Sequence, residues 1–107
     1  MQIELLYWEG CPSHPKALEQ LREQIAALGI GQEVSVRRIE SEEQAATEHF
    51  VGSPTIRVDG ADVVDPGEQP PALNCRVYRT REGRYSPTPD PQDVRAALVA
   101  AQRRERR

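Results

Sequence analysis

A cysteine and a histidine stand three residues apart in the segment Trp8-Glu9-Gly10-Cys11-Pro12-Ser13-His14. The segment follows a short apolar run and precedes an amphipathic helical pattern, which places Cys11 at a strand-to-helix turn. Free backbone N–H groups and the positive end of the helix dipole favour an anion at such a turn. A thiol there tends to have a lowered pKa and to be nucleophilic. Cys11 is therefore the predicted reactive group, in a motif spaced like a redox dithiol with His14 as its second member.

His14 and Cys75 each have more than one interpretation. Three residues along a helix bring Cys11 and His14 onto one face. His14 would then stabilise the thiolate, act as a general acid–base group or bind a metal with Cys11, or else be an exposed polar residue of the first turn. Cys75, the only other cysteine, is a resolving thiol, a third metal ligand, or a packed residue of a half-buried strand.

Length and charge bound the class of protein. The chain has 107 residues, which suits one domain spanning 1–107, and its net charge of −3 gives no general signal for nucleic-acid binding. No segment approaches the roughly 20 apolar residues that a membrane span needs, and no signal-peptide pattern is present. Two cysteines are too few for a secreted disulfide scaffold. We therefore expect a cytoplasmic protein without a nucleic-acid or membrane partner.

Hydrophobic periodicity predicts the elements that position these residues. Strands are expected at 2–7, 33–39, 54–58 and 61–64, and helices at 12–28, 41–50 and 91–103. A helix between the first two strands predicts parallel pairing, and Asp59-Gly60 predicts an antiparallel hairpin. In the second strand, the apolar residues Val34, Val36 and Ile39 are set against the polar residues Ser35 and Arg37. Residues 65–89 depart from the pattern, with a proline-rich loop and a small ribbon.

The order β-α-β-α-β-β-α, with Cys11 after the first strand and the segment Val51-Gly52-Ser53-Pro54-Thr55 opening the third, resembles the thioredoxin-like superfamily. The resemblance covers 2–64 and 90–103. It implies an α/β fold with a mixed four-stranded sheet flanked by helices, and an extra loop or ribbon at about 65–89. It also implies that Pro54 is cis and packs against Cys11, and that the backbone of Ser53 pairs with extended peptide substrates.

These features predict a thiol–disulfide oxidoreductase without a cofactor. Cys11 would attack a protein or low-molecular-weight disulfide, and Cys75 or an external thiol would resolve the mixed disulfide. Trp8 and Pro12, which flank Cys11, join Ser53 and Pro54 as predicted substrate-binding residues, although Trp8 would equally suit the edge of the core.

Two other functions remain open at this point. In one, Cys11, His14 and Cys75 bind a soft metal such as zinc, copper or mercury. In the other, the domain is a redox-inactive scaffold that binds a partner. The placement of Cys75 relative to Cys11 is the observation that separates these hypotheses.

Overall fold

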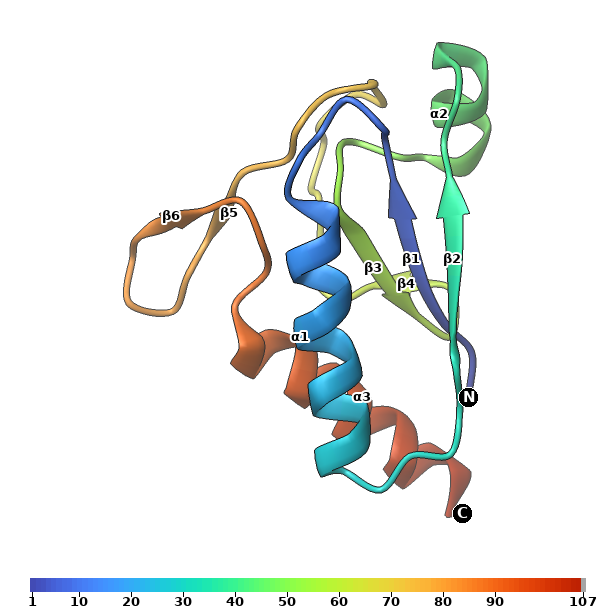
Figure 1. The fold of residues 1–107 in the computed structure, drawn as a ribbon, viewed down its shortest axis with the longest axis vertical. Coiled ribbons are helices and arrows are strands. Elements are labelled where there is room, and N and C mark those ends of the chain that lie inside the picture. The colour runs from blue at the N-terminus through green and yellow to red at the C-terminus, as the bar shows by residue number, and fades with distance from the viewer. Residues whose placement is uncertain (107) are drawn as a thin grey trace.

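The computed structural model describes residues 1–106 and has a mixed α/β architecture (Figure 1). The main sheet contains β1 (Ile3–Tyr7), β2 (Val34–Arg38), β3 (Thr55–Val58) and β4 (Ala61–Asp62). The helices are α1 (His14–Ala27), α2 (Glu42–Glu48) and α3 (Pro91–Glu105), and a separate ribbon pairs β5 (Tyr78–Arg79) with β6 (Tyr85–Ser86). The basic end of the chain forms the last turn of α3, and Arg107 lies outside the described residues.

The four strands lie in the order β2-β1-β3-β4. Strands β1 and β2 are parallel, whereas β3 runs antiparallel to both β1 and β4. The turn between β3 and β4 has φ values of 52° at Asp59 and 83° at Gly60, which suits the tight hairpins that twisted strands favour. The predicted parallel pairing and the predicted hairpin are both confirmed.

The two faces of the sheet carry different side chains, because successive residues of a strand point to opposite sides. Ile3 and Leu5 pack with α1 and α3 in the larger apolar cluster, whose helical members include Leu21 and Leu98. Leu6 points the other way, into a smaller apolar cluster beside α2. In Figure 1, α1 and α3 cross in front of the sheet, and α2 lies at the end of β2.

Two of the three helices begin at a side-chain cap. Ser41 accepts a 3.0 Å hydrogen bond from the Gln44 N–H at the start of α2, and Asp90 accepts one of 2.8 Å from Gln92 at the start of α3. Ser13 holds the equivalent position before α1 but makes no side-chain capping bond. Helix α1 begins at His14, later than the expected residue 12. Because the Ser13 hydroxyl does not cap the helix, it is left for another contact.

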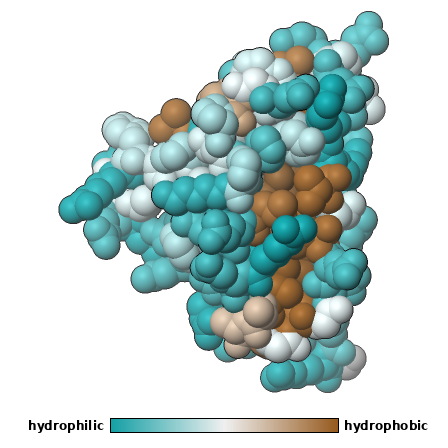
Figure 2. Space-filling view, viewed as in Figure 1, coloured by the Kyte–Doolittle hydropathy of each residue, from teal (hydrophilic) through white to brown (hydrophobic). Residues whose placement is uncertain are grey.

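The second strand, β2, has an exposed apolar residue at Val36. Val36 is 42% exposed, and three of the five residues of β2 are exposed. The reason is that β2 is an edge strand, with β1 as its one neighbour in the sheet. Figure 2 shows apolar side chains gathered in a strip on the visible face, in the region between α1 and β2 of Figure 1.

Residues 65–89 leave the hairpin and return along the segment that precedes β3. We call residues 72–78 the return segment. The Ala72 N–H donates to the Phe50 carbonyl at 3.0 Å, and the Tyr78 hydroxyl donates to the Pro54 carbonyl. The ribbon of β5 and β6 then projects away from the sheet (Figure 1). Within residues 1–106, the helices all lack the length and apolar character needed to cross a membrane.

Candidate thiol site

Cys11 lies in the turn between β1 and α1, two residues before the cap position of the helix. Its N–H donates a 3.0 Å hydrogen bond to the Trp8 carbonyl, which closes the turn. The side chain is only 1% exposed, and its sulfur donates to the Ser53 carbonyl at 3.4 Å. The sequence predicted this placement at a strand-to-helix turn, but it did not predict that the thiol would be buried.

The return segment brings Cys75 to the same place. Ser53 and Cys75 form an isolated parallel β-bridge, in which the Ser53 N–H donates to the Asn74 carbonyl and the Arg76 N–H donates to the Ser53 carbonyl, both at 2.8 Å. Cys75 itself is exposed, and both cysteines are free thiols. The two cysteines, which come from distant parts of the sequence, therefore both lie next to Ser53, Cys11 through its sulfur and Cys75 through its backbone.

The two thiols change one another's pKa in opposite directions. Burial by itself raises the pKa of Cys11, but hydrogen bonds outweigh it, with the Cys75 thiol contributing most and Ser13 adding to it. The pKa of Cys11 therefore lies below its ordinary value. The pKa of Cys75 lies above its ordinary value, first because of the hydrogen bond with Cys11 and then because of burial. The arrangement favours a thiolate at Cys11 and a protonated thiol at Cys75.

Ser53 has both backbone groups engaged within the chain. The peptide bond between Ser53 and Pro54 is cis, and Ser53 is fully buried. Its hydroxyl oxygen has no hydrogen-bond partner among residues 1–106, so this group is free to donate to the sulfur of Cys11 when that sulfur is ionised. The backbone positions that the resemblance assigned to a peptide substrate are occupied by Asn74 and Arg76.

His14 contacts the ring of Tyr7 and the backbone of Cys11. Its ring stacks on Tyr7, with centroids 4.1 Å apart, and its Nδ1 lies 3.1 Å from the Cys11 carbonyl oxygen. The contact is with the backbone of Cys11 and not with its sulfur. The predicted roles of His14 in proton transfer or thiolate stabilisation stay predictions, and its observed contacts position the turn.

Trp8 and Pro12 differ in how they flank the site. Pro12 is exposed beside Cys11. Trp8 is half-buried and packs against the smaller apolar cluster beside α2. Its ring also covers Gly10, where an added Cβ would lie 2.4 Å from the indole. A side chain at position 10 would displace the ring, so the glycine allows Trp8 to fold over the turn.

Gly52 is a residue of the site that sequence reasoning missed. Its φ is 154°, and an added Cβ would lie 2.9 Å from the Cβ and 3.1 Å from the Cα of Arg76. Because Arg76 belongs to the return segment, only a glycine lets that segment approach Ser53 so closely. The local signal was a glycine two residues before the proline, which predicted a turn and gave no indication of the partner.

Arg76 is the second residue that sequence reasoning missed. Its side chain is 6% exposed and donates to the Val64 carbonyl at 2.7 Å and to Asp62 at 3.2 Å. Its guanidinium also lies over the ring of Tyr78, 4.6 Å from the centroid. These contacts fix the backbone on one side of Cys75, so the position of the exposed thiol is set by a buried arginine.

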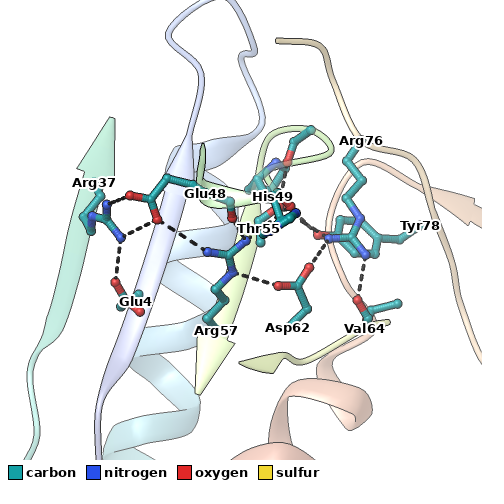
Figure 3. Close-up of polar contacts among 12 residues, drawn as sticks. Glu4, Arg37, Glu48, His49, Thr55, Arg57, Asp62, Val64, Arg76 and Tyr78 are labelled. Carbon is teal, nitrogen blue, oxygen red and sulfur yellow. Dashed lines mark hydrogen bonds and ion pairs between the residues drawn. The ribbon is translucent and has the colours of Figure 1, made fainter. Parts of the chain in front are cut away.

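Arg76 ends a chain of alternating charges that crosses the sheet (Figure 3). Its members come from β1, β2, α2, β3, β4 and the return segment, and they are Glu4, Arg37, Glu48, Arg57, Asp62 and Arg76. Asp62 accepts from Arg57 at 2.8 Å as well as from Arg76. The carboxylate thus bridges the sheet and the segment that carries Cys75.

The structure brings Cys11, Ser53, Pro54 and Cys75 together, with His14 beside the backbone. Within the described residues 1–106, His, Cys, Asp and Glu side chains form no group of three that could hold a metal ion. Searches against family models, curated proteins and solved structures find no match to this chain. The function must therefore be argued from the site itself.

Proposed function

We propose that this protein is a thiol–disulfide oxidoreductase of the thioredoxin-like class, which cycles between a Cys11–Cys75 dithiol and a Cys11–Cys75 disulfide. The observation that carries the proposal is the Ser53–Cys75 bridge, which brings the exposed Cys75 beside the Ser53 carbonyl that the Cys11 sulfur contacts. The hydrogen bonding of the two thiols lowers the pKa of Cys11 and raises that of Cys75. A low-pKa thiolate beside a second thiol is the arrangement that thiol–disulfide exchange requires.

The layout of the sheet supports the thioredoxin-like assignment. The chain passes β-α-β-α-β-β before the inserted residues and finishes with a helix. The site lies where β1 meets α1, and Pro54 immediately precedes β3. Residues 65–89, which the resemblance left unexplained, supply Cys75. The missing second cysteine of the turn is thereby replaced by one from the return segment.

The reaction balances without a cofactor. The Cys11 thiolate and the Cys75 thiol react with a disulfide RSSR, which breaks the S–S bond of the substrate and forms one between the two cysteines. One equivalent of RS⁻ and one of RSH are released, and the proton comes from Cys75. Two electrons pass from the protein to the substrate, and the reverse reaction oxidises two external thiols.

Two measurements test the proposal on the full chain. Equilibration with dithiothreitol in its reduced and oxidised forms is expected to convert the pair reversibly between dithiol and intramolecular disulfide. Alkylation as a function of pH is expected to give a Cys11 pKa below the unperturbed value of about 8.5, and Cys75→Ser is expected to raise it. A Cys11 pKa near 8.5, together with failure to form the disulfide, would overturn the proposal.

Gly52→Ala tests whether the placement of Cys75 controls Cys11. The added methyl group is expected to push the return segment away, because it would meet the backbone of Arg76. The Cys11 pKa should then rise toward its value in the Cys75→Ser variant, although Gly52→Ala keeps both cysteines. Gly31→Ala is the matched control, since a Cβ at Gly31 meets nothing within 4 Å. An unchanged Cys11 pKa in a folded Gly52→Ala variant would contradict the coupling.

A further inference from the structure

The two sulfurs of the pair are not equally accessible. Cys11 is 1% exposed and lies against the Ser53 carbonyl, whereas Cys75 is exposed at the outer side of the same bridge. We infer that Cys75 is the sulfur that exchanges with external thiols. Cys11 is then the buried partner, which is the leaving group when the Cys11–Cys75 disulfide is reduced and which re-forms that disulfide on oxidation. This inference rests on the proposed function and reverses the order of the two cysteines that the sequence predicted.

The return segment, which carries Cys75, is held against the chain by backbone and side-chain contacts along its length. Asn74 and Arg76 occupy both backbone hydrogen-bonding groups of Ser53. The Arg76 side chain is buried and bound to Asp62 and to the Val64 carbonyl. Ala72 and Tyr78 bind the carbonyls of Phe50 and Pro54 at either end. A substrate approaching from solvent therefore meets Cys75 first.

The occupied bridge also bears on the kind of substrate. A peptide strand added beside Ser53 would need its N–H and carbonyl groups, since such binding depends on main-chain hydrogen bonds. These groups are already bonded within the chain. The geometry thus favours a thiol that needs only the exposed sulfur of Cys75, such as a low-molecular-weight thiol, over an extended peptide that pairs with this edge.

The chemistry of the disulfide form agrees with this order. An external thiolate RS⁻ attacks the sulfur of Cys75, the Cys11–Cys75 bond breaks, and its electron pair leaves with Cys11. Cys11 is the better leaving group, because hydrogen bonds to its sulfur lower its pKa and a thiol of lower pKa leaves faster. A second RS⁻ then attacks the bound RS sulfur, which gives RSSR and a Cys75 thiolate that takes up a proton.

The test maps the mixed disulfide. The full chain is first oxidised with dithiothreitol disulfide, mixed briefly with glutathione, and quenched with acid and N-ethylmaleimide. Trypsin separates the two cysteines, because cleavage at Lys16 releases residues 1–16 and cleavage at Arg57 and Arg76 releases residues 58–76. Mass spectrometry is expected to find glutathione on the 58–76 peptide and N-ethylmaleimide on the 1–16 peptide.

Single-cysteine variants give a second measurement that does not depend on trapping. With 4,4′-dithiodipyridine, and with each rate corrected to the thiolate fraction, Cys75 in Cys11→Ser is expected to react about tenfold or more faster than Cys11 in Cys75→Ser, because exchange depends on access to the sulfur. Tryptophan fluorescence and amide hydrogen exchange of both variants check that the fold is retained.

Each outcome decides the question. Glutathione on the 1–16 peptide, or a faster Cys11 in the single-cysteine comparison, would overturn the assignment of Cys75 while leaving the redox pair intact. Failure of the oxidised pair to form at all would overturn both the pair and the assignment. Glutathione on the 58–76 peptide together with a faster Cys75 supports the inference.

Discussion

The two faces of the central sheet are built in opposite ways. On the face covered by α1 and α3, side chains such as Leu5, Leu21 and Leu98 are fully buried in one apolar cluster. On the other face, alternating charges run from Glu4 to Arg76, with a small apolar cluster beside α2 (Figure 3).

The apolar face mainly stabilises the fold, whereas the charged face mainly determines where particular segments lie. Apolar burial is non-directional and scales with the area removed from water, so the first face provides most of the stability. Charged hydrogen bonds have defined geometry. The second face therefore fixes where β4 and the return segment lie, and through Arg76 it fixes the position of Cys75.

The largest effect is expected on the apolar face. Leu98→Ala removes a fully buried side chain and should lower the free energy of unfolding by about 2–5 kcal/mol, since it leaves a cavity. Urea denaturation measures the loss. The Cys11 pKa of the folded protein should not change, because Leu98 does not touch the thiol site. A loss below 1 kcal/mol would mean that this face is not the main source of stability.

An intermediate effect is expected where the charged face ends. Arg76→Met keeps the length of the side chain but removes its bonds to Asp62, Thr55 and the Val64 carbonyl. We expect a loss of about 1–3 kcal/mol, because buried acceptors lose their donor while Asp62 keeps Arg57. Unlike Leu98→Ala, this change should also raise the Cys11 pKa.

The control for Arg76→Met is Arg84→Met, because the side chain of Arg84 is 82% exposed. That substitution should leave both the urea midpoint and the Cys11 pKa unchanged. If Arg76→Met altered stability but left the Cys11 pKa unchanged, the charged face would stabilise the fold without positioning the thiols.

The smallest effect concerns pH and Glu48. The hydrogen bond from Arg37 holds the pKa of Glu48 below its ordinary value, against an opposing effect of burial. A lowered pKa in the folded state stabilises the protein above the unfolded pKa of about 4.3, and this stabilisation is lost as pH falls through the folded pKa. Glu48→Gln should therefore cost up to about 1 kcal/mol at neutral pH, as for a partly exposed ion pair.

Urea denaturation from pH 7 to pH 3 checks the sign of this effect. The difference in stability between the parent protein and Glu48→Gln should shrink on acidification. Glu9→Gln should show little difference at any pH, because the Glu9 side chain is 70% exposed in its pair with Arg38. A Glu48→Gln difference that grew in acid would contradict the assigned direction of the Glu48 pKa.

Local sequence signals were sufficient for the sheet and its helices. The apolar run of β1, the three- and four-residue steps of Leu21 and Ile25 in α1, and the cap at Asp90 each arise from neighbours in the chain, so they are readable from it. The exposure of Val36 could not be predicted, because alternation separates the faces of a strand but does not show whether that strand lies at an edge of the sheet.

The site was predictable only in part. The turn that holds Cys11 follows from its neighbours in sequence. The approach of Cys75 depends on Arg76 meeting Asp62 and on the space left by Gly52, which are contacts between distant segments. The small ribbon within residues 65–89 was expected, but the path of residues 72–78 was not, because hydrogen bonds to Phe50, Ser53 and Pro54 fix that path.

The turn that folds Trp8 over Gly10 has an optical consequence. Trp8 is the only tryptophan of the chain, and its carbonyl accepts the hydrogen bond from the backbone of Cys11. The indole fluorescence of this protein therefore comes from a single ring at the thiol turn. If the proposed Cys11–Cys75 disulfide forms, we expect this fluorescence to change, so that the reaction could be followed without an attached dye.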